Sequence, residues 1–96
     1  ATKLEILVRI ARNLKAAHLR AGDLPRALAA VERIMILRPS DYGEIRERGL
    51  ILAKLGLATK ALVDLETYLR LDPDAVDSDE VWEQVRAIRG ARSMLI

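Results

Sequence analysis

Basic side chains at matching positions are the part of this 96-residue sequence best suited to chemistry. Arg12 and Arg46 lie 34 residues apart, and Arg20 and Lys54 have the same separation. A row of such cations can hold carboxylates through paired, charge-assisted hydrogen bonds, so we expect it to bind an acidic partner. The seven candidate partner-binding residues, which include two apolar ones lying between the cations, are Arg9, Arg12, Leu19, Arg20, Arg46, Leu50 and Lys54.

The same cations also fit a second interpretation, in which they form a solvated helix face. In that case they pair with acidic neighbours such as Glu44 and Glu47 and bind no partner.

Catalytic and metal-binding chemistry is poorly represented. The chain has no cysteine, and His18 is its one histidine. Thiol catalysis and a cysteine-ligated zinc site are therefore excluded, and no serine or acid lies at a spacing that suggests a triad with His18. The acidic stretch 72–83 lacks the glycine of a calcium-binding loop. We expect no enzyme activity, no catalytic residue, no metal and no cofactor.

The net charge of +2 conceals an uneven distribution. Residues 1–40 carry +5, residues 41–83 carry −6 and residues 84–96 carry +3. A chain of this kind is dipolar rather than basic, and aromatic residues suited to stacking on bases make up only 3%. We expect no nucleic-acid partner, although binding through the basic N-terminal helix stays as the alternative function.

The ends and the hydropathy indicate a setting. No apolar run approaches the roughly 20 residues of a membrane span, so we expect no membrane partner. The start at Ala1 has neither an initiator methionine nor a signal-peptide pattern, which suggests a piece of a longer cytoplasmic protein. Twelve arginines against four lysines hint at a GC-rich bacterial genome.

An internal repeat of 34 residues organises the chain. It relates Gly22 to Gly56, Ala27 to Ala61 and Pro39 to Pro73. Each unit reads as two helices at helical apolar spacing, with glycine ending the first and proline ending the second. We expect an all-α helical-hairpin fold in one domain, with repeat one over about 4–39 and repeat two over about 41–73.

Local signals predict the helix boundaries. Gly22 supplies the left-handed position after the first helix, and Asp23 caps the second. Asp41 with Glu44, and Asp77 with Glu80, fit capping boxes for later helices. The apolar stripe expected for the first helix is Leu4, Leu7, Ala11, Leu14, His18 and Ala21.

A fifth helix is expected over about 77–90, followed by a tail at 91–96. Its apolar positions are Val81, Trp82, Val85 and Ile88. They do not fit a third repeat, so we expect a helix that caps the open end of the second pair. At the other end, Ile6, Val8 and Ile10 lie off the first stripe. That face is predicted to pack on an upstream domain or on a second copy, which would give a homodimer.

These features resemble the tetratricopeptide repeat. The alanine of the second helix and the closing proline match in both units, whereas the first-helix aromatics are missing. The matching positions are Ala11, Leu14, Lys15, His18, Ala27, Val31 and Pro39 in unit one, and Ile45, Arg48, Gly49, Leu52, Ala61, Leu65 and Pro73 in unit two. The resemblance implies that the first helix of each pair lines a concave groove, which places the seven candidates there. Family carboxylate clamps also use Asn; Asn13 fits, but Glu47 departs from that pattern.

A narrower resemblance concerns one bacterial family, in which a transglutaminase-like domain precedes a short tetratricopeptide tail. The segments that carry it are Arg12-Asn13-Leu14-Lys15, His18–Asp23, Ile45–Leu50 and Leu71–Asp77. It implies that any catalytic cysteine lies in another part of the protein.

The sequence therefore predicts a non-catalytic protein-interaction module. Its basic concave groove would hold an acidic protein or peptide, or an upstream domain of the same protein. The remaining alternative is a purely structural or dimerising appendage of a larger enzyme-like protein.

Overall fold

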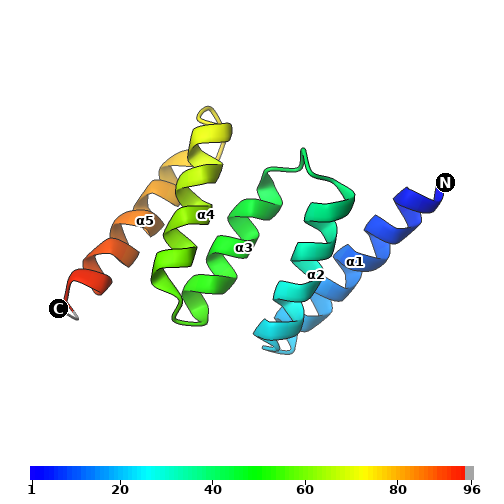
Figure 1. Cartoon of the computed structure of the whole chain (residues 1–96), viewed down its shortest axis with the longest axis horizontal. Helices are drawn as coiled ribbons and strands as arrows, with labels where there is room; N and C mark the ends of the chain where they lie inside the picture. The colour runs from blue at the N-terminus through cyan, green and yellow to red at the C-terminus, as the bar shows by residue number, and fades with distance from the viewer. Residues whose placement is uncertain (95–96) are drawn as a thin grey trace.

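The structure is a computed structural model that describes residues 1–94. Its regular elements are the helices α1 (Lys3–Arg20), α2 (Leu24–Leu37), α3 (Gly43–Lys54), α4 (Ala58–Leu71) and α5 (Ser78–Ser93). They lie side by side in chain order, with the two termini at opposite ends of the molecule (Figure 1). The expected all-α fold is confirmed.

The helices form two hairpins and a covering helix. α1 packs on α2, α3 packs on α4, α2 joins the two hairpins through α3, and α5 packs on α4. Each helix thus has its chain neighbours as its main packing partners, which gives an elongated shape of 49 × 30 × 18 Å. No helix within residues 1–94 is long and apolar enough to cross a membrane.

The ends of α1 and α3 follow the sequence signals. Gly22 and Gly56 have φ angles of 73° and 81°, a conformation that side chains with a Cβ disfavour. The Asp23 carboxylate accepts a hydrogen bond from the backbone N–H of Arg26 at 3.1 Å and so caps α2. The Thr2 hydroxyl caps α1 in the same way.

The two predicted capping boxes are wrong. α3 begins at Gly43 and α5 at Ser78, and the carboxylates of Asp41 and Asp77 bind arginines from earlier helices instead of the turns that follow them. The two aspartates form charge-assisted pairs with arginines from distant helices instead of capping the nearby backbone. α5 also runs to Ser93, three residues beyond its predicted end, and residues 95–96 of the predicted tail lie outside the described residues.

The core has two clusters. One lies between α4 and α5 and contains Leu62, Leu65, Tyr68, Leu69, Val81 and Val85. The other joins α2 to α3 through Ala27, Val31 and Ile51. Val81 and Val85 are 1% and 0% exposed, so α5 covers α4 as predicted, whereas Trp82 is 40% exposed and lies outside this contact.

The expected apolar stripe of α1 needs correction. Val8 and Ala11 are the buried residues of α1, although Val8 was placed off the stripe. Leu4, Leu7 and Leu14, placed on it, are 38%, 51% and 40% exposed. α2 therefore covers a narrower face of α1, rotated from the one that periodicity alone suggests.

The second hairpin has a close helix contact at Gly49. A Cβ added there would lie 2.9 Å from Leu65 Cγ and 3.1 Å from Asp64 Cβ. Leu65 is fully buried, so a side chain at position 49 would force Leu65 or the two helices to shift.

Candidate functional site

The equivalent arginines of the basic row each bind an aspartate at the start of the next helical unit. Arg12 Nη2 donates to Asp41 Oδ2 at 2.9 Å, and Arg46 Nη1 donates to Asp77 Oδ2 at 2.7 Å. The Arg12 side chain stays 50% exposed, whereas that of Arg46 is 29% exposed. The two residues that sequence treats as equivalent therefore differ in what they can still bind.

Arg46 belongs to a network that holds α5. Tyr68 donates its hydroxyl hydrogen to Asp77 Oδ1 at 2.5 Å, and the Arg46 guanidinium lies 5.5 Å from the centre of the Tyr68 ring. The hydrogen bond from Tyr68, aided by Arg46, lowers the pKa of the Asp77 carboxyl below its usual value. Burial, together with that hydrogen bond, raises the pKa of the Tyr68 phenol. We call these three residues the α5 latch.

The apolar candidates are part of the core contacts. Leu19 packs against the cluster between α2 and α3, and Leu50 packs against the cluster between α4 and α5. Both are half-buried by the chain itself. Arg20 and Lys54 are exposed in the last turns of α1 and α3.

A basic hollow gathers the remaining candidates. It has a volume of about 320 Å³ and is lined by Glu5, Val8, Arg9, Arg12, Asn13 and Arg38. Three guanidinium-bearing side chains thus line one concavity, two from α1 and one from the C-terminal cap of α2. Arg38 was not among the residues predicted from the sequence, although its position just before Pro39 marks it as the end of a helix.

A buried ionic contact connects α1 to α3. Lys15 Nζ donates to the two carboxylate oxygens of Glu44 at 2.9 and 3.2 Å and lies 3.6 Å from Glu47. The Glu44 side chain is 7% exposed, so Lys15 balances the negative charge of a carboxylate that is largely shielded from solvent. Glu44 and Glu47 thus pair with Lys15, which is not one of the seven candidates.

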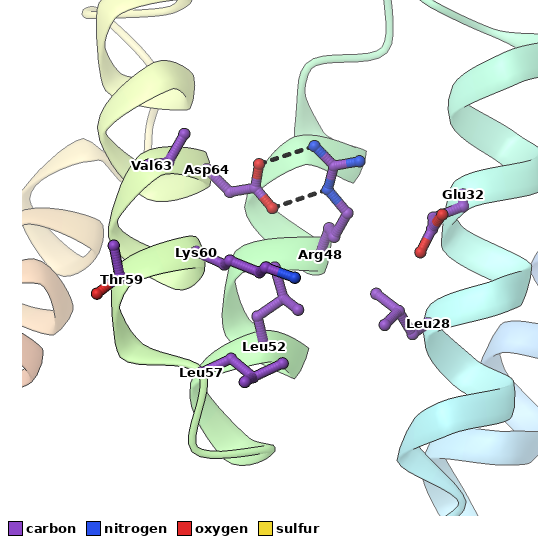
Figure 2. A pocket seen from close by; sticks show the side chains of 9 residues that line it. All are labelled: Leu28, Glu32, Arg48, Leu52, Leu57, Thr59, Lys60, Val63 and Asp64. Atoms are coloured by element: carbon purple, nitrogen blue, oxygen red, sulfur yellow. Dashed lines mark hydrogen bonds and ion pairs between the residues drawn. The ribbon is translucent and has the colours of Figure 1, made fainter.

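A second concavity is lined by residues of α2, α3 and α4. This groove, of about 410 Å³, lies between α2 and α4 (Figure 2). Arg48 donates two hydrogen bonds, of 2.8 and 2.9 Å, to the buried Asp64 carboxylate at one end of it. Leu28 and Glu32 of α2 face the α3 and α4 side chains across the open space in Figure 2. The pairing of Arg48 with Asp64 could not be predicted from the apolar periodicity, because both residues are charged.

The described residues provide no metal centre. Within residues 1–94 no three His, Asp or Glu side chains come together in a group that could hold a metal ion. His18 lines a small hollow between α1 and α2 beside Ala11 and Arg33.

Comparisons with known proteins agree with the repeat. The chain is 40% identical over 76 residues to a UPF0162 protein of Xylella fastidiosa, which covers 79% of the chain and 27% of that relative. It is 32% identical over 87 residues to the UPF0162 protein YchA of Escherichia coli, covering 91% of the chain and 31% of the relative. It is 30% identical over 88 residues to Protein SirB1 of Salmonella typhimurium, covering 92% and 33%.

The chain spans about a third of the length of these curated relatives. No solved structure matches it. The family model of the tetratricopeptide repeat matches residues 14–86, which include the C-terminal part of α1, all of α2, α3 and α4, and the first part of α5. Three-quarters of the chain thus carries the repeat pattern that the hairpins display, and the chain belongs to the tetratricopeptide repeat family.

Proposed function

We propose that this chain is a non-catalytic protein-interaction module whose basic hollow binds an acidic segment of a partner. Tetratricopeptide repeats generally mediate contacts between proteins. The observation that carries the proposal is the convergence of Arg9, Arg12 and Arg38 on one concavity of about 320 Å³. Such clustering favours a ligand that carries several carboxylates, because each guanidinium can donate two parallel hydrogen bonds.

The arginines of the hollow keep free donors. Arg12 uses one terminal nitrogen on Asp41 and is half exposed, so its other nitrogens are available. Among residues 1–94, neither Arg9 nor Arg38 takes part in an ion pair. Asn13 adds an amide that can donate to a carboxylate as well. Glu5 opposes an acidic ligand on its own side, so the ligand would lie toward Arg12 and Arg38.

The proposed site is narrower than the seven-residue row. Arg46 is committed to the α5 latch, and Leu19 and Leu50 are committed to the core. Arg20 and Lys54 remain exposed and would make outer contacts with a longer acidic segment. The partner segment belongs to another protein or to an upstream domain of the longer protein, such as the transglutaminase-like domain that the narrower resemblance implies.

The test compares two charge-reversed variants of equal net charge. Arg9→Glu/Arg38→Glu changes two residues of the hollow that are outside ion pairs. Arg70→Glu/Arg92→Glu changes two exposed arginines in the last turns of α4 and α5, as a matched control. Each protein is titrated with a fluorescent oligoglutamate peptide, and each is used to isolate partners from a bacterial lysate for identification by mass spectrometry.

We expect the hollow variant to lose the peptide and the specific partner, while the control keeps both. Binding should weaken as salt rises, because the charges are exposed. Equal binding by all three proteins would contradict the proposal. Repeating the isolation with the full-length protein distinguishes the two sources of the acidic segment. If an upstream domain already fills the hollow, the 96-residue chain should capture the partner and the full-length protein should not.

A further inference from the structure

An exposed aliphatic stripe runs along α1. It consists of Ile6, Leu7, Ile10 and Leu14, which are 43%, 51%, 51% and 40% exposed. Their spacing of three and four residues places them on one helix face. We call this surface the α1 stripe. Exposed aliphatic side chains this close together mark a surface that contacts something else.

The repeat indicates what shape fits there. Ala17 and Ala21 continue the stripe toward the end of α1, and their equivalents 34 residues later are Ile51 and Leu55. Ile51 is 3% exposed in a cluster with residues of α2, and Leu55 packs against the same cluster. In the second unit, therefore, α2 covers the C-terminal continuation of this face on α3. In the first unit no element of residues 1–94 covers it.

The edges of the stripe are basic on both sides. Arg26 and Arg33 of α2 line a hollow of about 180 Å³ beside Leu14, and the Arg26 side chain is 76% exposed. Arg9 and Arg20 of α1 lie three residues after Ile6 and Ala17, which places them along the opposite edge.

We propose that the α1 stripe binds an amphipathic helix whose aliphatic face is flanked by aspartate or glutamate. The helical shape follows from the way α2 covers the continuation of this face on α3, and the charge follows from the basic edges. A second copy of this chain fits poorly, because a two-fold contact places the same patch against itself and sets basic edges against basic edges. Arg9 both lines the basic hollow and borders the α1 stripe, whereas Arg20, Arg26 and Arg33 supply basic edges outside that hollow.

The test uses two synthetic helices with the same leucine face. One carries glutamate on both flanks of that face, and the other carries lysine at the same positions. Binding to the chain is measured by fluorescence anisotropy at physiological ionic strength. We expect the glutamate helix to bind roughly tenfold more tightly or better, and the lysine helix to bind weakly. Equal binding of the two helices would overturn the proposal.

Three double substitutions locate the contact. Ile10→Asn/Leu14→Asn should abolish binding of the glutamate helix, whereas Val63→Asn/Val76→Asn changes two residues of 61% and 107% exposure elsewhere and should leave it intact. Arg26→Gln/Arg33→Gln should narrow the difference between the two helices. Circular dichroism checks that each variant folds, and the comparison of the two helices on the unmodified chain remains decisive if one does not.

The remaining outcomes separate the occupants. Light scattering should show a monomer, and a dimer that Ile10→Asn/Leu14→Asn dissociates would assign the stripe to a second copy and overturn the proposal. Arg38→Glu lies in the basic hollow and should leave binding of the glutamate helix unchanged. If Arg38→Glu loses oligoglutamate binding but still binds the glutamate helix, the two sites act separately. Each proposal can then fail without the other.

Discussion

The two ends of the helical row are finished differently. At the C-terminal end, α5 buries Val81 and Val85 to 1% and 0% exposure against α4, and the α5 latch fixes its start. At the N-terminal end, α1 leaves Ile6 and Ile10 at 43% and 51% exposure. One end is closed by the chain itself, whereas the other presents the kind of face that the interior of the row buries.

The same contrast appears in the ion pairs that begin each unit. Arg12–Asp41 and Arg46–Asp77 use equivalent arginines, yet only the second pair has a tyrosine donating to its aspartate. The residue equivalent to Tyr68 in unit one is Ile34, which is fully buried and has no hydrogen-bond donor on its side chain. One side-chain difference therefore separates an exposed ion pair from a latch.

The largest expected effect tests the closed end against the open end. Leu65→Ala removes a fully buried side chain beside α5 and should lower the free energy of unfolding by about 2–5 kcal/mol. Leu7→Ala removes a side chain that is 51% exposed and should change it by less than about 0.5 kcal/mol. Urea denaturation followed by circular dichroism measures both, and similar losses at the two ends would contradict the comparison.

The next effect concerns the close contact of α3 with α4. Gly49→Ala places a methyl group 2.9 Å from Leu65 Cγ and should destabilise the protein by about 1–3 kcal/mol. Gly90→Ala is the matched control, because a Cβ there meets nothing within 4 Å. That change should stabilise α5 by about 0.5–1 kcal/mol. Thermal unfolding gives both signs, and a neutral Gly49→Ala would show that the hairpin can open at no cost.

A smaller effect probes the α5 latch and its dependence on pH. The lowered pKa of Asp77 means that its contribution is complete above the ordinary carboxyl value and is lost as the pH falls below about 3.9. The raised pKa of Tyr68 means that its contribution is complete below about pH 10 and is lost as the pH rises further.

Tyr68→Phe should therefore cost about 1.5 kcal/mol near neutral pH and remove the alkaline loss. Tyr42→Phe, at a 38% exposed tyrosine, serves as the control and should change the free energy of unfolding by less than about 0.5 kcal/mol near neutral pH. Denaturation midpoints across pH measure the effect, and an alkaline loss that persists in Tyr68→Phe would refute the role of this hydroxyl.

The smallest effect compares the two ion pairs directly. Arg12→Gln breaks a pair whose side chains are 50% and 33% exposed and should cost less than about 1 kcal/mol. Arg46→Gln breaks the less exposed pair and should cost more. Raising the salt concentration should shrink the first loss more than the second. Equal losses with equal salt dependence would remove the distinction drawn between the two junctions.

Much of the fold could be predicted because its signals are local. Gly22, Gly56, Pro39 and Pro73 act through their own backbones, so the hairpin boundaries follow from the sequence. Which face of α1 is buried could not be predicted, because Val8 and Leu7 are both aliphatic and only the rotation of α2 about α1 decides between them.

The candidate site was harder for the same physical reason. Asp41 and Asp77 look like local caps, but their arginines come from 29 and 31 residues earlier in the chain. Arg38 joins Arg9 only because the end of α2 returns beside the start of α1. Residues that packing brings together from distant segments cannot be identified from their spacing in the sequence.

The packing of each helix mainly on its chain neighbours governs how the molecule comes apart. Removing a terminal helix breaks one interface, whereas removing α3 from the middle breaks two. Opening should therefore begin at the ends and advance inward, as in a short one-dimensional lattice. The amides of α3 would then exchange their hydrogens last, and the end helices α1 and α5 would be the first that a protease reaches.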